Sequence, residues 1–394
     1  MTVAERHEAL TATFEAFRRT PAFGTGPLAE ARAAAFDRFL MRGFPTTRDE
    51  EWRFTNVAPI AALSYVQATP SMAVSALPPG VTSRPFRAGD ALSARASATP
   101  FADLNTALFE GGLVIEVAPK TIVREPIELS LASAPGDEPV IASPRIRLIV
   151  GEQAAVTIVE RYTGPAGRRA LTNAVTEVTV GPGARVDHVK VQDEPLTAFH
   201  LASLFIRLER ASAFRSHAIT FGGRIARNDI VAVLDGEGAE CTLNGLYIAT
   251  GDSLVDTHTT IDHAKAHCPS HELYKGILAG KSRAVFNGKI IVRPDAQKTD
   301  AKQTNKALLL TDDAQVNTKP QLEIFADDVK CTHGAAIGQL DDDALFYLQA
   351  RGIGVDEARH MLIEAFAGEV LDGIPVAALR ESLMQAMEAK LARR

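Results

Sequence analysis

Cys331 and His333 form the residue pair that points most directly to metal chemistry, and they lie just before a glycine-containing turn and an amphipathic stretch. A thiol and an imidazole are soft or borderline metal ligands, and both need only modest pKa changes to act near neutral pH. On a β-strand, a two-residue spacing directs both side chains to one face, about 6.5–7 Å apart. That separation is long for two ligands of one small ion, so the spacing indicates groups that line a shared surface.

A second concentration of candidate ligands occupies residues 256–271. Imidazole, thiolate and carboxylate groups can all bind zinc or iron, and the metal-ligand candidates here are His258, His263, His267 and Cys268. Three histidines of this segment fall four residues apart, as on a helix, but Pro269 argues against a continuous helix. We therefore expect polar residues at the turns of a β-fold, with a β-helical metalloenzyme as the alternative.

Composition and charge limit the function classes. The chain has 394 residues, of which 46% are hydrophobic and 23% charged, and its formal net charge is −6. This charge argues against nucleic acid or an anionic membrane as the main partner, because both favour basic surfaces. No segment approaches the roughly 18 uninterrupted apolar residues of a membrane span, and the charged N-terminus is unlike a signal peptide. Three widely spaced cysteines indicate a reducing compartment, so we expect a cytoplasmic protein.

Common catalytic motifs are missing from the sequence. It contains no Walker-type phosphate loop, no Gly-x-Ser-x-Gly elbow and no His-Glu-x-x-His pair, so we expect neither an ATP site nor a familiar hydrolase. Lone histidines at 188, 200 and 217 lie in strand-like runs and are expected to face solvent or to be hydrogen-bonded locally. Cys241 is expected to be a small buried hydrophobic residue.

Hydrophobic periodicity divides the chain into three regions, of which the first is residues 1–105. Helical spacing predicts an N-terminal helical region, and from residue 66 onward the Ala-, Ser- and Pro-rich sequence predicts a loosely structured connection. The single tryptophan, Trp52, is expected to anchor this region against the next domain.

The second region, residues 106–338, is predicted to be a β-domain. From about 110 to 325, runs rich in Val, Ile, Thr and Leu alternate with glycine-containing turns. Similar segments recur mostly 27–30 residues apart, with one longer gap, and begin at Gly151, Gly181, Glu209, Gly236 and Gly280. This repeat indicates a stacked β-solenoid in which each turn rises about 4.8 Å. A β-sandwich is the alternative, since Asn-Gly pairs at 244–245 and 287–288 would suit hairpins.

The third region, residues 339–394, returns to helical periodicity. Asp341 is expected to cap a helix that ends at Gly352, and two further helices are expected from near Val355 and Pro375. Apolar residues lie along one side of these helices. Such a bundle either caps the solenoid or presents a surface to another protein.

A series of longer motifs runs through the chain in one order. They are Glu51-Trp-Arg-Phe-Thr, Tyr274-Lys-Gly-Ile-Leu, Asn317-Thr-Lys-Pro-Gln-Leu-Glu-Ile, Lys330-Cys-Thr-His-Gly-Ala-Ala-Ile-Gly and Leu340-Asp-Asp-Asp-Ala-Leu-Phe-Tyr-Leu-Gln-Ala-Arg-Gly. Together they resemble the SufD subunits of the SUF iron–sulfur cluster assembly system. The likeness covers nearly the whole chain and is strongest from about 255 to 367. The Lys-Cys-Thr-His-Gly segment is similar to SufD rather than to the sister subunit SufB.

The resemblance implies a right-handed parallel β-helix core between an N-terminal helical region and a C-terminal helical domain. It also implies pairing with SufB through the β-helix end near 331–333, and docking of the ATPase SufC on the C-terminal helices 344–394. His333 inherits the role of a proposed cluster ligand at the SufB–SufD interface, and Cys331 inherits a supporting role. The implied iron–sulfur cluster is transient and shared with SufB, and no cofactor bound tightly by the isolated chain is implied.

The leading hypothesis is therefore a scaffold subunit that catalyses no turnover by itself. The β-helical metalloenzyme built on residues 256–271 is the rival. A carbohydrate-active β-helix is disfavoured because aromatic residues make up only 6% of the chain. A homodimer of the isolated chain, the cluster type, the iron donor and the involvement of a flavin are left open by the sequence.

Overall fold

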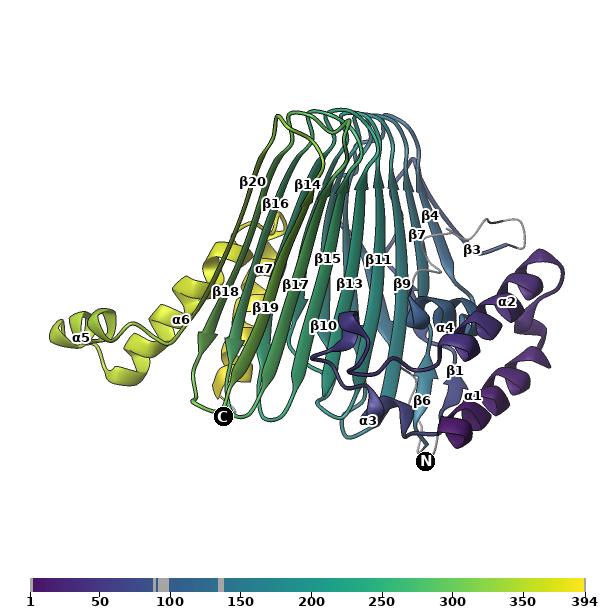
Figure 1. Cartoon of the computed structure of the whole chain (residues 1–394), viewed down its shortest axis with the longest axis horizontal. Coiled ribbons are helices and arrows are strands. Elements are labelled where there is room, and N and C mark those ends of the chain that lie inside the picture. The colour runs from purple at the N-terminus through teal and green to yellow at the C-terminus, as the bar shows by residue number, and fades with distance from the viewer. Residues whose placement is uncertain (1–2, 88–89, 91–98, 134–137, 393–394) are drawn as a thin grey trace.

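The strands of this protein stack into two sheets that face each other and form a parallel β-solenoid (Figure 1). The computed structural model describes residues 3–87, 90, 99–133 and 138–392. One sheet has eleven strands, with the order β19-β17-β15-β13-β11-β9-β7-β4-β3 and with β1 and β6 attached beside it. The other has nine, in the order β2-β5-β8-β10-β12-β14-β16-β18-β20. Along most of the solenoid, successive strands alternate between the sheets, so each coil adds one strand to each sheet.

The strand bounds follow this alternation. The eleven-stranded sheet contains β1 (Val66–Ala68), β3 (Val81–Pro85), β4 (Leu113–Val117), β6 (Val140–Ala142), β7 (Arg145–Val150), β9 (Ala170–Val180), β11 (Phe199–Leu208), β13 (Ile225–Leu234), β15 (Leu254–His263), β17 (Arg283–Val292) and β19 (Gln315–Ile324). The nine-stranded sheet contains β2 (Ser71–Val74), β5 (Ile127–Ala132), β8 (Ala155–Thr163), β10 (Arg185–Asp193), β12 (Ala213–Thr220), β14 (Glu240–Ala249), β16 (Pro269–Leu278), β18 (Asp300–Leu309) and β20 (Lys330–Gly338).

The solenoid prediction is confirmed, and the β-sandwich alternative is wrong. The pairs from β8 to β20 and from β7 to β19 are all parallel, whereas β2–β5 and β3–β4 near the N-terminal end are antiparallel. The Asn-Gly pairs that suggested hairpins lie inside the long strands β14 and β17. There the glycines make room for side chains of the opposite sheet or the neighbouring coil, since a Cβ at Gly245 would lie 2.3 Å from the Tyr274 ring.

A column of left-handed backbone residues marks one corner of the solenoid. The residues after the strands of the eleven-stranded sheet have φ between 53° and 70°, and they are Gln153, Gly183, Ala211, Gly238, His267 and Lys298. The N–H of His267, for example, donates to the Gln297 carbonyl of the next coil over 2.9 Å. The glycines that begin the sequence repeat lie two residues before such positions. A Cβ at Gly151, Gly181 or Gly236 would lie 2.0–2.9 Å from the backbone of the preceding coil, so glycine recurs there at the coil interval.

One assignment within the repeat is wrong. Gly280 follows β16 of the nine-stranded sheet and therefore belongs to the opposite corner, together with Gly251 after β14. This explains the longer gap in the sequence pattern.

The lumen between the two sheets holds the main apolar core. Alternate residues of each strand point inward, and Ile158, Val186, Phe214, Leu243 and Phe286 are among the buried residues there. Parallel coils place equivalent residues in columns along the solenoid, so every inward position continues into the next coil.

The N-terminal helices cover the outer face of the eleven-stranded sheet. They are α1 (Val3–Arg18), η1 (Pro21–Phe23), α2 (Pro27–Arg42), η2 (Glu50–Trp52), α3 (Ala58–Ala61) and α4 (Pro100–Leu108). Their apolar side chains pack in one cluster with Leu201, Ile225 and Leu254 of the sheet. Trp52 belongs to this cluster, which confirms its role as an anchor.

The expectation of a loosely structured connection over 66–105 is wrong for the residues that the structure describes. Strands β1, β2 and β3 pair with the solenoid, and α4 is buried along its whole length. The Thr99 side chain caps α4 by accepting a hydrogen bond from the Ala102 N–H. Residues 88–89 and 91–98 of this stretch lie outside the described residues.

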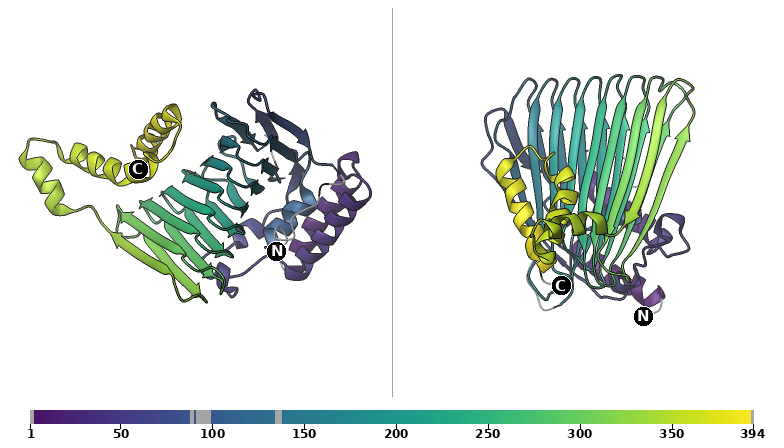
Figure 2. Two further views of the ribbon diagram at one scale, coloured as in Figure 1. Left: turned by 90° about the horizontal axis from the view of Figure 1, so that it is seen from above. Right: turned by 90° about the vertical axis from the view of Figure 1, so that its left-hand side faces the viewer.

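The C-terminal helices are α5 (Asp342–Ala350), α6 (Val355–Leu371) and α7 (Ala377–Ala392). Helices α6 and α7 pack on the outer face of the nine-stranded sheet, where Val370, Leu383 and Met387 join its outward apolar residues. The Lys275 ammonium donates to the Phe366 carbonyl of α6 over 2.7 Å. Helix α5 lies away from the sheets, beyond the solenoid (Figure 2), and Asp341 caps it as predicted.

Within the described part of the chain, no helix has the length and apolar character needed to cross a membrane.

Candidate functional site

The C-terminal end of the solenoid is an open end formed by two edge strands. Among the described strands, β19 pairs only with β17, and β20 pairs only with β18. Neither is covered by α5–α7, which diverge to the side (Figure 2). Strand β20 is exposed along almost its whole length. Unpaired N–H and C=O groups on two adjacent long edges form a surface on which another chain can extend both sheets.

Cys331 and His333 lie on β20 and face the lumen at this open end. Cys331 pairs in register with Ala301, and His333 pairs with Gln303; both partners are buried inward residues of β18. The two side chains therefore share one face, as the two-residue spacing predicts. His333 is nevertheless exposed, because no further coil covers it.

The Cys331 thiol is partly buried at the edge of a small apolar cluster that contains Leu322 and Val329. Burial raises the pKa of this thiol, and the nearby Asp300 carboxylate adds to the effect. A raised pKa disfavours the thiolate that binds metals. Cys331 is therefore a weak metal ligand by itself.

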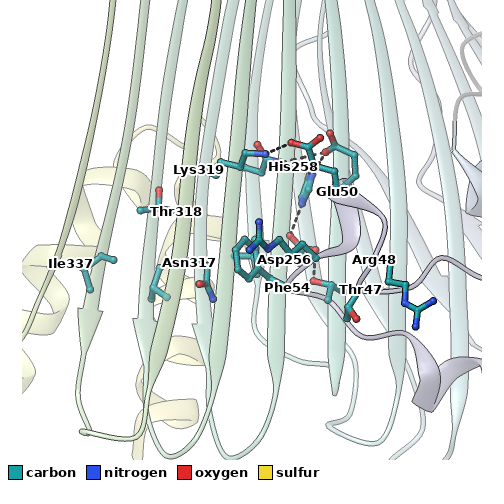
Figure 3. A pocket seen from close by; sticks show the side chains of 16 residues that line it. Thr47, Arg48, Glu50, Phe54, Asp256, His258, Asn317, Thr318, Lys319 and Ile337 are labelled. Carbon is teal, nitrogen blue, oxygen red and sulfur yellow. Dashed lines mark hydrogen bonds and ion pairs between the residues drawn. The ribbon is translucent and has the colours of Figure 1, made fainter.

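A cavity of about 720 Å³ adjoins the open end on the outer side of the eleven-stranded sheet. One wall comes from the segment around η2, and the opposite wall comes from the strands β15, β17 and β19 (Figure 3). Ile337 of β20 also lines it, so the cavity reaches the last coil. Lys319 of β19 donates to the Glu50 carboxylate over 2.6 Å and ties the two walls together.

The wall of this cavity and the residues packed behind it carry a dense charged network. The Arg227 guanidinium lies 3.8 Å from the Trp52 ring centroid and donates to Asp256 over 2.6 Å. His258 contacts Asp256 with one ring nitrogen and Glu51 with the other, each at 3.1 Å. Because Glu51 and Trp52 come from the N-terminal segment, the network clamps that segment onto the solenoid.

Burial and pairing oppose each other in this network. Burial disfavours charge at both His258 and Asp256, but their mutual attraction and their other partners outweigh it. The pKa of His258 is raised to about 9 by the carboxylates of Asp256 and Glu51. The pKa of Asp256 is lowered to about 2, mainly by Arg227 and His258. A protonated His258 beside Arg227 is a poor metal ligand, since both ring nitrogens then carry protons.

The other candidate ligands of residues 256–271 are not brought together. His263 faces the lumen and contacts the Ser270 hydroxyl at 3.0 Å, whereas His267 is exposed at a corner. The Cys268 thiol donates to the Gly236 carbonyl at 3.3 Å. His267 and Cys268 lie in the corner between β15 and β16, as expected of turn residues, whereas His258 and His263 lie within β15, contrary to that expectation.

Within the described residues, a single group of three His, Cys, Asp or Glu side chains has ligand atoms all within 4.8 Å of one another: His360, Glu364 and Glu388. It lies on the exposed sides of α6 and α7. This group was not among the candidates singled out from the sequence. The four-residue spacing of His360 and Glu364 within a predicted helix was a signal for two of its three members.

The lone histidines differ from expectation in burial. His188, His200 and His217 are all buried, because β10, β11 and β12 are interior strands. Each has a local polar contact, such as the 2.9 Å contact between His188 and the Ser216 hydroxyl. Cys241 is buried in the lumenal core, as predicted.

The raised pKa of His258 predicts a pH-dependent clamp. The folded-state pKa is about 9 against an ordinary value of 6.5, so its stabilising effect is complete below pH 6.5 and is lost as the pH rises through 9. We expect the difference in melting temperature between wild type and His258→Gln to be largest at pH 6 and to shrink toward zero by pH 10. Other groups also titrate in this range, for example Lys190, because burial lowers its pKa to about 8. Their effect on the melting temperature is common to both proteins and cancels in the difference. A difference that does not vary over this range would contradict the assignment.

The fold and the open end together define a class of protein: a β-solenoid subunit that presents a lumen-facing Cys-x-His pair on an unpaired last coil. The family model for the SUF system FeS cluster assembly SufBD core domain matches residues 132–366. The chain therefore belongs to the SufBD family of the SUF iron–sulfur cluster assembly system.

Individual relatives support the same assignment. An iron–sulfur cluster assembly SufBD family protein of Synechocystis is 31% identical over 92% of this chain and 91% of its own length. The iron–sulfur cluster assembly protein SufD of Escherichia coli is 40% identical over 65% of this chain and 60% of its own length. A SufBD family protein of Mycobacterium tuberculosis is 30% identical over 92% of this chain and 94% of that protein.

Proposed function

We propose that this protein is a scaffold subunit for iron–sulfur cluster assembly that pairs with a SufB-type subunit through its open end. The observation that carries the proposal is the exposure of His333 on the lumen-facing side of an unpaired last coil. In the preceding coils, the position equivalent to His333 is covered by the next coil. At the last coil, another chain would have to provide this cover. The partner's last coil would supply that cover.

The open end has the chemistry of a stable protein interface. Exposed apolar side chains gather there, with Ile324 and Phe325 at the end of β19 and Ile337 on β20. Pairing along β19 or β20 would add backbone hydrogen bonds to the apolar burial. Apolar burial and backbone hydrogen bonding both favour an extended interface that continues the two sheets into the partner, rather than a small contact.

The proposed site holds the nascent cluster in the covered interface. The His333 imidazole would bind an iron atom, and thiolates or carboxylates of the partner would complete the coordination. Cys331 has a raised pKa and would act in support. A site with few thiolates releases its cluster more readily than a storage site, which suits a scaffold. All three cysteines are free thiols, in keeping with the reducing cytoplasm that we propose as its location.

A second surface suits the SUF ATPase. Helix α5 has no buried residue, and its Phe346 and Tyr347 are 73% and 55% exposed. Two large aromatic side chains on an isolated helix are typical of binding anchors. We propose that α5 and the adjoining part of α6 dock SufC, and that nucleotide-driven movement of SufC reaches the open end through β20, which leads directly into α5.

The two proposed interfaces can be separated by matched substitutions. We expect Ile337→Asp to prevent co-elution with the SufB-type subunit and to leave ATPase binding unchanged, because a buried charge in an apolar interface is costly. Phe346→Asp should have the opposite effects. Size-exclusion chromatography of the purified chain with each partner measures both. Retention of the SufB-type subunit by Ile337→Asp would sink the assignment of the open end.

A further inference from the structure

Three polar residues form one lumenal column that leads to the open end. Glu272 of β16 pairs in register with Gln303 of β18, which pairs with His333 of β20. Neighbouring positions in such a column lie about 4.8 Å apart. Glu272 and Gln303 are 3% and 2% exposed, so they lie directly beneath His333 in the closed part of the lumen.

The fold satisfies these buried groups poorly. Among the described residues, neither carboxylate oxygen of Glu272 and neither amide atom of Gln303 has a hydrogen bond of standard geometry. The same is true of the hydroxyls of Thr259 and Tyr274 in the same coils. Thr259 and Gln303 are the side chains that act on the Glu272 carboxyl as hydrogen-bond partners, but their geometry is poor. Buried polar atoms without a well-formed hydrogen bond are uncommon in folded proteins, and a bound ion is one arrangement that satisfies them.

The middle of the lumen provides a contrast. There the Glu160 carboxylate accepts from Tyr162 over 2.7 Å and from Thr176 over 3.1 Å, and it lies 3.3 Å from His188. Lys190 donates to Asn228 over 2.6 Å. Glu160 and Lys190 in the middle of the lumen thus have well-formed hydrogen bonds, whereas Glu272 and Gln303 near the open end do not.

Gln303 is placed so that it bridges the two sheets. Its amide nitrogen would lie 1.4 Å from a Cβ at Gly288 of β17, so only glycine at 288 leaves room for it. Gly288 pairs in register with Thr259, which faces Glu272 one coil deeper. The Gln303 amide therefore lies between Glu272 and the open end.

We propose that Glu272 and Gln303 form a divalent-cation site beneath His333, which holds substrate iron(II) before it joins the cluster. This site rests on the proposed scaffold function and deepens it. A carboxylate and an amide oxygen are hard donors that suit iron(II) or manganese(II) and bind them weakly enough for release. The Thr259 and Tyr274 hydroxyls would supply further oxygen contacts. The cation enters through the open end, past Gln303, and leaves toward the His333 imidazole in the adjacent coil.

Manganese(II) alone is a suitable probe for the purified full-length chain, with the free ion counted by electron paramagnetic resonance. All proteins compared carry Glu388→Gln, which removes one possible ligand from the group formed by His360, Glu364 and Glu388 on α6 and α7, so that this group does not compete for manganese. We expect one site in this background, and Glu272→Gln should weaken it at least about tenfold. Gln303→Glu adds a carboxylate in the same place and should tighten binding. The matched control is Glu323→Gln, which removes an exposed charge on β19 and should leave the affinity unchanged.

The proposal is overturned if the chain binds no manganese at a saturable site, or if Glu272→Gln and Gln303→Glu both bind as the background does. Circular dichroism melts show whether each variant folds. If Glu272→Gln does not fold, the manganese affinity of Gln303→Glu decides the question. Co-elution with the SufB-type subunit is measured on the same samples. Normal pairing without manganese binding would remove the cation site alone, whereas failed pairing with intact binding would remove the scaffold function alone.

Discussion

Replacement of His333 by alanine is expected to lower cluster formation by the assembled complex at least about tenfold, the scale on which metal sites respond to lost ligand interactions. The imidazole is exposed on the last strand, so its loss leaves no cavity in a packed core and the fold should persist. The readout is the visible absorption of the anaerobically reconstituted complex, together with transfer of the cluster to an apo-acceptor. Unchanged co-elution with both partners shows that the effect is local.

Two neighbours serve as controls for His333. Thr332 lies between Cys331 and His333 and points to the opposite face, so Thr332→Ala should assemble clusters normally. Cys331→Ser should reduce the yield less than His333→Ala, because Cys331 is proposed to act only in support and burial, which raises its thiol pKa, disfavours the thiolate. Normal cluster yield from His333→Ala would end the site assignment.

The solenoid was predictable from sequence because its corners impose a backbone rule. After strands of the eleven-stranded sheet the chain passes so close to the backbone of the preceding coil that a Cβ would not fit at Gly151, Gly181 or Gly236, and this requirement leaves glycines at regular intervals. The common face of Cys331 and His333 was predictable for an equally local reason, the period of two along a strand. The C-terminal helices followed from periodicity and from the Asp341 cap.

Features that depend on register were not predictable in this way. Gln303 and Glu272 are 31 residues apart, and their alignment beneath His333 depends on the exact length of every turn between them. The polar character of each residue alone does not reveal this alignment. Short strands β1, β2 and β3 were missed because they have few residues and are stabilised by pairing with the solenoid, which local composition does not record.

The clamp at His258 shows a second limit. Its partner Glu51 is 207 residues away in sequence, and Trp52 beside it meets an arginine of β13. Histidine, carboxylate and cysteine in one segment suggested a metal site, but the strand periodicity separates these side chains. The carboxylates of Asp256 and Glu51 favour the protonated form of His258 despite the nearby Arg227 charge, and the resulting cation holds the N-terminal segment.

Removal of the Arg227 guanidinium should have the largest effect on stability. Arg227 and Asp256 are almost fully buried, and the guanidinium also donates to the Glu51 carbonyl over 2.8 Å and to Asp229 over 2.7 Å. Arg227→Met leaves Asp256 buried without its main counter-charge, which costs about 3–5 kcal/mol. We expect this loss in the free energy of unfolding measured with guanidinium chloride, with faster hydrogen exchange over residues 47–56.

The matched control is Arg207→Met, because Arg207 lies on the same sheet but its ion pair with Asp235 is exposed. That substitution should cost less than about 1 kcal/mol. In the double variant Arg227→Met with Asp256→Asn, no buried carboxylate is left unpaired, so part of the lost stability should return. If Arg227→Met costs no more than Arg207→Met, the clamp contributes little, and the N-terminal helices must be held by their apolar cluster instead. The extent of recovery in the double variant separates the cost of the stranded charge from the loss of Trp52 packing against the guanidinium.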